Sequence, residues 1–153
     1  LPEIQSLDAK EVMRQKLLAA EKHAKGYYIV EDTSLYLGCL QNALPGPFIK
    51  WFEKSLGIGE IALLAQRLGN TDAQAKTIIG FIENSGAMHF FEGMLRGQVV
   101  SPRGGNDFGW GPIFVPVGHE KTFGEMTREE KHAISMRGIA VRGLREYVLS
   151  RKT

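Results

Sequence analysis

Two strand-like segments separated by a short turn constrain the fold of this chain more than any other feature. Residues 75–83 are rich in β-branched and apolar side chains, and residues 87–100 resume that pattern after the turn sequence Asn-Ser-Gly. Such segments predict an antiparallel hairpin. Gly93 and Gly97 interrupt the second arm, and glycines inside a strand are typical of bulges or bends. The sequence therefore predicts a hairpin whose second arm is irregular.

A helix is predicted ahead of the hairpin, over residues 6–26. Asp8 suits the N-cap, Glu11 completes a capping-box pattern, and Gly26 is a typical C-terminal stop. One apolar arc of this helix contains Val12, Met13, Ala20 and Ala24. Lys16 falls inside the same arc. On the pattern alone, we expect its stem to pack while the ammonium reaches water.

Two shorter helices are predicted between that first helix and the hairpin. Pro47 suits the first position of one of them, which Gly57 ends. The other follows directly and ends at Gly69. The residues Phe48, Phe52 and Leu56 recur at helical spacing. Aromatic residues at this spacing are usually core, so they indicate no cofactor site.

The C-terminal residues 127–152 carry a helical pattern with a break. Thr127 and Glu130 form a second capping box, and Ser135 suits the N-cap of a fresh helix. On one straight helix Lys131 and Arg137 would lie about 120° apart and diverge. A break at Ser135 lets both side chains point at one site.

A short buried strand is expected at residues 26–30, and it runs directly into Glu31 and Asp32. Two carboxylates at the end of a buried strand are costly unless they are exposed, paired or metal-bound. In an extended chain the two side chains point to opposite faces. We therefore expect separate roles for them unless the backbone turns.

The composition is that of one ordinary globular domain of 153 residues. A net charge of +2 gives no broad field for nucleic acid or an anionic membrane. The single cysteine, Cys39, suits a reducing compartment, so we expect a cytoplasmic location. The chain opens on Leu-Pro-Glu without a methionine, and we expect that a native N-terminal segment precedes it.

One set of charged and aromatic residues, scattered along the chain, fits a magnesium–nucleotide site. Its members are Glu3, Lys16, Glu31, Asp32, the loop 101–110, Lys131, Ser135 and Arg137. Carboxylates suit Mg²⁺, which usually bridges to substrate phosphates. Lysine and arginine suit phosphate oxygens, and Phe108 and Trp110 suit base stacking. The same residues would also fit unrelated surface charges and core aromatics.

The motifs resemble, in order and spacing, those of the inosine triphosphate pyrophosphatase family. They are LPEIQ, VEDTSL, LPGPFIKWF, SPRGGNDFGWGPIF, TFGEMTREEKHAIS and SMR. The resemblance spans nearly the whole chain. It implies an elongated α/β fold, with a mixed sheet flanked by helices and a nucleotide cleft between two lobes. It also implies Mg²⁺-dependent hydrolysis of non-standard purine nucleoside triphosphates (ITP, dITP, XTP) to the monophosphate and pyrophosphate, by a homodimer.

The same resemblance implies a role for each candidate residue. Asp32 and Lys16 would be catalytic, with Lys16 contacting phosphate. The metal would be held by Glu3, Glu31 and Asp32. The base or phosphates would contact Phe108, Gly109, Trp110, Lys131, Ser135 and Arg137. A pocket that offers only donors at position six of the purine disfavours adenine, because the adenine amino group would be buried unpaired.

Three features of the chain depart from the family pattern. No Ser/Thr-x-Asn-x-x-Lys phosphate loop is present in the sequence. Gly111 stands where the family has a pocket aspartate, and Met136 stands where it has a base-reading histidine. Methionine offers no donor to a ring carbonyl. A non-catalytic relative that binds nucleotide or a partner is therefore the alternative, as is a fragment completed by a missing segment or a partner chain.

Overall fold

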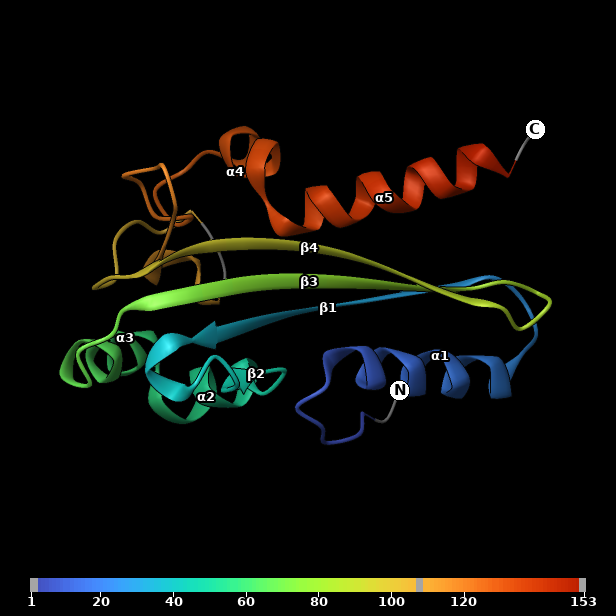
Figure 1. Cartoon of the computed structure of the whole chain (residues 1–153), viewed down its shortest axis with the longest axis horizontal. Helices are drawn as coiled ribbons and strands as arrows, with labels where there is room; N and C mark the ends of the chain where they lie inside the picture. Colours follow the sequence, from blue (N-terminus) through green and yellow to red (C-terminus); the bar gives the residue numbers. More distant parts are fainter. Residues whose placement is uncertain (1–2, 107–108, 152–153) are drawn as a thin grey trace.

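The computed structural model describes residues 3–106 and 109–151, in which helices lie on both faces of a five-stranded sheet (Figure 1). The helices are α1 (Ala9–His23), α2 (Ile49–Leu56), α3 (Ile58–Arg67), α4 (Arg128–Ile134) and α5 (Met136–Ser150), with 3₁₀ turns η1 (Gly38–Leu40) and η2 (Gly111–Ile113). The strands are β1 (Tyr28–Leu37), β2 (Pro45–Gly46), β3 (Asp72–Ile82), β4 (Met88–Val99) and β5 (Phe114–Pro116). The α/β class and the elongated sheet are confirmed.

The strands follow the order β2-β1-β3-β4-β5, and each described pair is antiparallel. The expectation of a mixed sheet is therefore wrong for the described residues. β3 and β4 run in opposite directions because a tight hairpin joins them. The longer connections between the other paired strands also return the chain in the opposite direction.

The predicted hairpin forms the centre of the sheet. β3 and β4 pair without interruption from Asp72 opposite Gln98 to Ile82 opposite Met88. Of the bulges or bends predicted at Gly93 and Gly97, the bulges are wrong, because both glycines stay in register. They instead permit close packing. A Cβ at Gly93 would lie 1.9 Å from the Met136 carbonyl oxygen at the start of α5.

Strand β1 is longer and more exposed than predicted. It pairs with β3 along its whole length, but on its other edge it meets β2 only at Leu35 and Tyr36. Ile29 is 61% exposed, whereas Leu35 is fully buried. The expected short buried strand is thus an edge strand that is buried at one end. Glu31 and Asp32 lie within it, on its open part.

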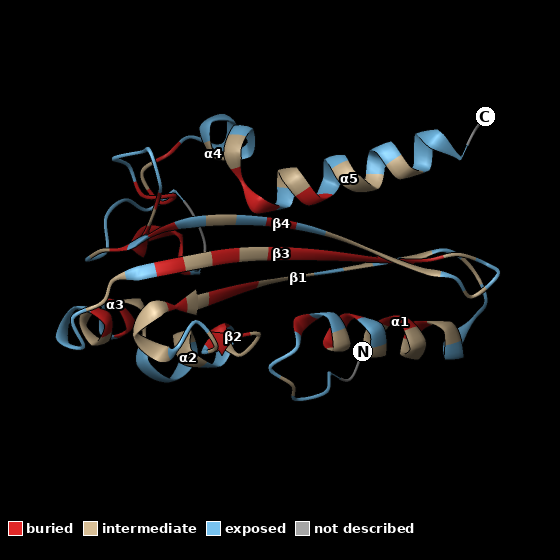
Figure 2. Ribbon diagram, in the orientation of Figure 1, coloured by how far each residue is buried: buried red, intermediate tan, exposed pale blue. Residues whose placement is uncertain are grey.

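Helices α1 and α5 cover opposite faces of the sheet (Figure 1). The buried side chains of α1, among them Val12 and Met13, pack against Ile78 of β3. Figure 2 shows that the buried segments of both helices face the strands, whereas their outer turns are exposed. The Asp8 carboxylate accepts hydrogen bonds from the backbone N–H groups of Lys10 and Glu11, so the predicted N-cap is confirmed. α1 ends at His23, three residues before Gly26.

A larger core lies at the other end of the sheet, where α2 and α3 pack. It gathers Leu35, Leu37, Ile49, Ile61, Ala62, Ala65, Ala73, Ala75, Val99, Trp110, Ile113, Phe114, Phe123, Met126 and Met136. Gly57 ends α2 as predicted, with φ of 80°. Pro47 precedes the N-cap Phe48 and so lies just outside the helix. Within the described residues, no helix combines the length and apolarity needed to cross a membrane.

Candidate active site

Asp32 lies in a hollow of about 280 Å³ between α1, β1 and the start of α2. The hollow is lined by Glu3, Ile4, Gln5, Ser6, Val12, Lys16, Asp32, Thr33, Pro47, Phe48, Ile49, Lys50 and Trp51. The Oδ2 atom of Asp32 is buried and accepts no hydrogen bond from any described residue. Nearby, the Lys16 Nζ atom lies 3.4 Å from Oε1 of Glu3. This hollow brings together two carboxylates and a cation that are distant in sequence.

The surroundings of Asp32 in the hollow favour the protonated form of its carboxyl group more than water does. Burial raises the pKa of its carboxyl group above the ordinary value of 3.8, and the charge of Glu3 raises it further. The positive charges of Lys16 and Lys50 oppose this rise. A partly desolvated carboxylate with one oxygen lacking a partner among the described residues gains from a cation or proton that reaches it.

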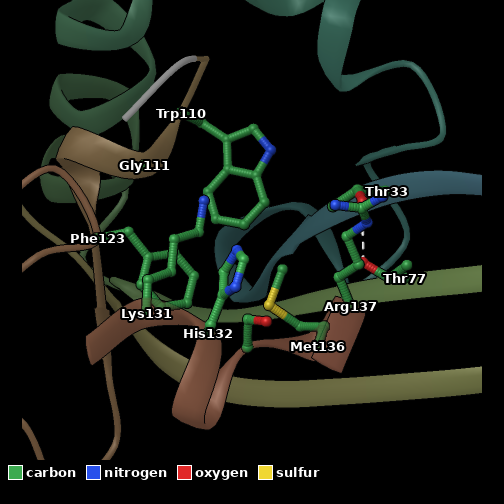
Figure 3. A pocket seen from close by; sticks show the side chains of 10 residues that line it. Thr33, Thr77, Trp110, Gly111, Phe123, Lys131, His132, Met136 and Arg137 are labelled. Atoms are coloured by element: carbon green, nitrogen blue, oxygen red, sulfur yellow. Dashed lines mark hydrogen bonds between the residues drawn. The ribbon is translucent and has the colours of Figure 1, made fainter. Parts of the chain in front are cut away.

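A second hollow, of about 270 Å³, lies between the sheet, the loop before β5 and the junction of α4 with α5. It is lined by Thr33, Thr77, Trp110, Gly111, Phe123, Lys131, His132, Ser135, Met136 and Arg137 (Figure 3). Trp110, Phe123 and Met136 supply apolar surface. The polar side chains of the lining can all donate hydrogen bonds, and they are Thr33, Thr77, Lys131, His132, Ser135 and Arg137. No described carboxylate lines it. We call this hollow the aromatic pocket and the first one the acidic hollow.

The predicted helix break shapes the aromatic pocket. Thr127 and Glu130 form the complete capping box of α4, and the Ser135 hydroxyl accepts a hydrogen bond of 3.1 Å from the Gly138 N–H to cap α5. Lys131 and Arg137 consequently line the same pocket, as the break predicted.

Glu31 is not brought together with the other predicted metal ligands. Its Oε2 atom accepts a hydrogen bond of 3.0 Å from Nε of Arg137, on the α5 side of the sheet. Asp32 interacts with Lys16 and Glu3, on the α1 side. This separation follows from strand alternation, which predicted opposite faces. Among the described residues, no three His, Cys, Asp or Glu side chains lie close enough to hold a metal ion.

Asp32 and Glu3 nevertheless fit a magnesium ion. Mg²⁺ in nucleotide enzymes is usually bound by one or two carboxylates together with waters and substrate phosphates. The buried Oδ2 of Asp32 lacks a partner among the described residues, and Glu3 is half-exposed beside it. The two side chains provide the oxygen donors that such a site needs.

The acidic hollow and the aromatic pocket are neighbours across one strand. Thr33 lines both of them. β1 separates the two, and its outer edge has no described strand partner from Tyr28 to Ser34. Each hollow is close to the lower limit of about 300 Å³ for ligand pockets. One ligand with an aromatic end and an anionic end could therefore occupy both around this edge.

Comparisons with known proteins agree with this geometry. A sequence model described as the Ham1 family matches residues 1–147. The chain belongs to the Ham1 family. It is 44% identical to the inosine triphosphate pyrophosphatase of Schizosaccharomyces pombe, over 99% of this chain and 80% of that protein.

Solved structures give the same result for the Ham1 fold. The chain is similar to a HAM1 protein from Coxiella burnetii, with a TM-score of 0.87 and 26% identity over 97% of this chain and 81% of that one. It is also similar to a nucleoside-triphosphatase, dITP/XTP pyrophosphatase, from Mycobacterium abscessus. That match has a TM-score of 0.75 and 29% identity, over 94% of this chain and 76% of the other. The resemblance stated from the motifs is therefore confirmed.

Among the other residues predicted from the Ham1 motifs, Trp110 lines the aromatic pocket, whereas Gly109 precedes it in the chain and is not part of the lining. Trp110 is only 8% exposed and meets Phe114 edge-on, with ring centres 5.4 Å apart. Gly109 has φ of 67°, a conformation that favours glycine. Phe108, the predicted stacking residue, lies outside the described residues. Gly111 and Met136 are both buried in the pocket wall.

Sequence reasoning missed several residues that line the two hollows of this Ham1 chain. They are Thr33, Lys50, Thr77, Phe123 and His132. All of them except Thr77 lie within quoted motifs, so position in a motif was an available signal. The Thr33 and Thr77 hydroxyls lie 2.9 Å apart, and this contact depends on the β1–β3 register, for which the sequence gives no signal.

Proposed function

We propose that this protein hydrolyses non-standard purine nucleoside triphosphates, such as ITP, dITP and XTP, to the monophosphate and pyrophosphate. One observation carries the proposal. The Oδ2 atom of Asp32 accepts no hydrogen bond from the described residues, and the next residue, Thr33, also lines a pocket of aromatic and donor side chains. A triphosphate in the acidic hollow and a purine in the aromatic pocket would use both parts. The names of the relatives support the same substrate class.

In the proposed reaction, Asp32 accepts a proton from the attacking water. The water oxygen forms a bond to the α-phosphorus, and the bond from that phosphorus to the bridging oxygen breaks, so that pyrophosphate leaves. A general base works best when its pKa lies near the working pH. In the cation-free protein burial raises the pKa of Asp32 in that direction, and a bound Mg²⁺ would lower it again. Lys16, whose side chain is 18% exposed, offers its ammonium to the phosphate oxygens.

The proposed cofactor is Mg²⁺, held by Asp32 and Glu3. When bound, the cation would neutralise negative charge on the phosphate oxygens. Glu31 has a different proposed role, which is to hold the guanidinium of Arg137 at the aromatic pocket. The predicted three-carboxylate set is thereby reduced to two.

Base preference follows from the hydrogen-bonding groups of the aromatic pocket. Hypoxanthine and xanthine carry an acceptor oxygen at position six, whereas adenine carries an amino donor. Lys131, Ser135 and Arg137 line the pocket and can all donate. Adenine would leave its amino group without an acceptor from any described lining carboxylate. A buried unpaired donor costs about 1–3 kcal/mol.

The experiment that tests this function is a substrate panel with product identification. Inosine, xanthosine, guanosine, adenosine and pyrimidine triphosphates are incubated with Mg²⁺, and the phosphorus products are resolved by nuclear magnetic resonance. We expect monophosphate and pyrophosphate from the inosine and xanthosine substrates. Release of orthophosphate together with the nucleoside diphosphate would contradict the proposal. Equal turnover of all five kinds of triphosphate would contradict it too.

A second candidate is a non-catalytic nucleotide-binding or interaction module. Buried Met136 favours it, because this side chain offers no donor at the pocket wall. The same panel separates the two candidates. Nucleotide-dependent stabilisation without hydrolysis of any triphosphate would support the module. Assembly as a homodimer and a cytoplasmic location stay further predictions, and sedimentation equilibrium tests the first.

A further inference from the structure

His132 is a pocket residue with no role in the mechanism above. It lies in α4, directly after Lys131, and lines the aromatic pocket. In Figure 3 its ring projects towards the indole of Trp110, between Lys131 and Met136. It also lines the adjoining hollow beside Gly138 and Val141. The imidazole therefore stands at the mouth of the pocket and faces its interior.

Most of the other polar side chains of the pocket make at least one contact within the protein. The Thr33 and Thr77 hydroxyls contact each other at 2.9 Å. The Ser135 hydroxyl caps α5, and Nε of Arg137 donates to Glu31. The His132 ring, by contrast, makes no hydrogen bond to any described residue. Its nitrogen atoms are available to a ligand without breaking a contact of the folded protein.

We propose that His132 is a specificity-determining residue, which donates a hydrogen bond from its ring to the oxygen at position six of a 6-oxopurine. This inference rests on the proposed function. It deepens that function by naming the residue that reads the base edge. Imidazole carries one N–H donor when neutral and two when protonated. Either form can donate to a carbonyl oxygen, and the protonated form cannot accept from the amino group of adenine.

The position of Met136 explains why such a donor is needed. Met136 is 4% exposed and occupies the pocket wall beside Ser135 with a thioether, which donates no hydrogen bond. His132 enters the same pocket from α4, on the other side of the helix break. A donor is thus provided by α4 where the first residue of α5 provides none.

The test measures binding of inosine and adenosine monophosphates by isothermal titration calorimetry. The variants are His132→Ala and His132→Gln, with His119→Ala as the matched control. His119 is an exposed histidine that lines neither hollow. We expect His132→Ala to weaken inosine monophosphate binding by about three- to tenfold, the worth of one hydrogen bond. Adenosine monophosphate binding should not change, and the control should match the wild type for both ligands.

Steady-state kinetics give a second readout. We expect His132→Ala to raise KM for ITP while leaving kcat nearly unchanged. His132→Gln keeps a side-chain donor, so its preference for inosine over adenosine should exceed that of His132→Ala. Equal loss of both nucleotides, an unchanged preference, or identical behaviour of the two variants would overturn the inference.

The two proposals fail in different ways. If the wild type hydrolyses ITP in preference to ATP and His132→Ala keeps that preference, only the role of His132 is wrong. If the wild type neither binds inosine monophosphate nor hydrolyses ITP, the proposed function and this inference fail together.

Discussion

At the scale of single residues, Asp32 combines partial burial with an unmet hydrogen bond. Its Oδ2 atom is enclosed and accepts nothing from the described residues. Burial, helped by Glu3, raises the pKa of its carboxyl group, so the folded protein binds this proton more tightly than the unfolded chain does. Such a residue lowers stability at neutral pH, and functional sites commonly carry this kind of cost.

The first prediction is that Asp32→Asn stabilises the cation-free protein. The pKa of Asp32 is higher in the folded protein than its ordinary value of 3.8. Protonated Asp32 therefore stabilises the wild-type protein at low pH, and this contribution is lost as the pH rises from about 3.8 through the pKa of the folded state. The asparagine variant does not titrate there. We expect it to be more stable at pH 8 by on the order of 1 kcal/mol, since solvent screens part of the charge. The advantage should shrink towards pH 4.

Urea unfolding in the presence of a chelator measures this difference. Asp72→Asn is the control, because Asp72 is exposed at the start of β3 and lines neither hollow. If Asp32→Asn is less stable than wild type at pH 8, the ionised carboxylate of Asp32 stabilises the folded protein, and the prediction is wrong.

The second prediction separates the two roles considered for Glu31. Its ion pair with Arg137 is open to solvent, with side chains 44% and 62% exposed respectively. Exposed pairs are worth about 0.2–1 kcal/mol. Glu31→Gln should therefore change the free energy of unfolding by less than about 1 kcal/mol. We expect a raised KM for ITP and an unchanged Mg²⁺ concentration at half-maximal rate.

The Mg²⁺ concentration at half-maximal rate is measured by titrating the initial rate with Mg²⁺ at saturating ITP. The matched variant is Glu3→Gln, which should raise the required Mg²⁺ concentration. A comparable rise in Glu31→Gln would restore Glu31 to the metal site.

Several residue-level features could be predicted from sequence, and others could not. Strand alternation predicted that Glu31 and Asp32 diverge, and the structure confirms it. The stem of Lys16 packs as the helical pattern predicted, but its ammonium pairs with Glu3 in the acidic hollow. Its contact with phosphate stays a prediction. The Thr33–Thr77 contact could not be predicted, since it depends on how two strands 44 residues apart align.

At the scale of elements, the glycines of β4 determine how closely α5 approaches the sheet. A Cβ at Gly93 would lie 1.9 Å from the Met136 carbonyl oxygen and 2.8 Å from its carbon. Both neighbours are backbone atoms, which cannot move aside cheaply. Gly93 thus positions the first turn of α5, and with it the wall of the aromatic pocket.

The third prediction is that Gly93→Ala destabilises the protein by at least about 2 kcal/mol, as overpacking of a rigid contact does. It should also weaken nucleotide binding, because Met136 and Arg137 would shift. The control is Gly59→Ala in α3, where an added Cβ has no neighbour within 4 Å. Alanine favours a helix over glycine, so this variant should gain roughly 0.5–1 kcal/mol.

Thermal unfolding of the two glycine variants provides the comparison. Equal stability of Gly93→Ala and wild type would mean that α5 can move away from β4 without loss, and the role of Gly93 as a positioning residue would be abandoned.

The sequence predicted the helix ends well, because a helix cap depends only on residues a few positions apart in the chain. The capping residues Asp8, Thr127 and Ser135 each cap the helix that the sequence predicted. Strand β1 was predicted less well, because its exposure depends on what pairs with its outer edge. The purpose of Gly93 was also missed, since a glycine in a strand pattern does not reveal whether a bulge or a neighbouring backbone requires it.

At the scale of the whole molecule, the sheet brings residues from the beginning, middle and end of the chain to one edge strand. Glu3 and Lys16 reach Asp32 from one face, and Arg137 reaches Glu31 from the other. The family motifs supplied the candidate site residues, whose roles stay predictions. They did not predict that the acidic hollow and the aromatic pocket lie on either side of β1, because this depends on tertiary packing.

The fourth prediction is a linked stabilisation by nucleotide and cation. A ligand that binds only the folded state stabilises it by about 2.7 kcal/mol at a hundred times its Kd. We expect inosine monophosphate with Mg²⁺ to raise the melting temperature more than the sum of the two added separately, because Asp32 and Glu3 need phosphate oxygens to complete the cation site. Strictly additive shifts would show that the cation and the nucleotide bind independently.

Pyrophosphate release from ITP by Asp32→Asn measures whether the Asp32 carboxylate takes part in the chemistry. We expect the variant to fold, to bind inosine monophosphate in the absence of Mg²⁺ within about threefold of wild type, and to lose about 10²-fold or more in kcat, the usual contribution of a general base. A variant that releases pyrophosphate at the wild-type rate would contradict the assignment of the chemistry to Asp32.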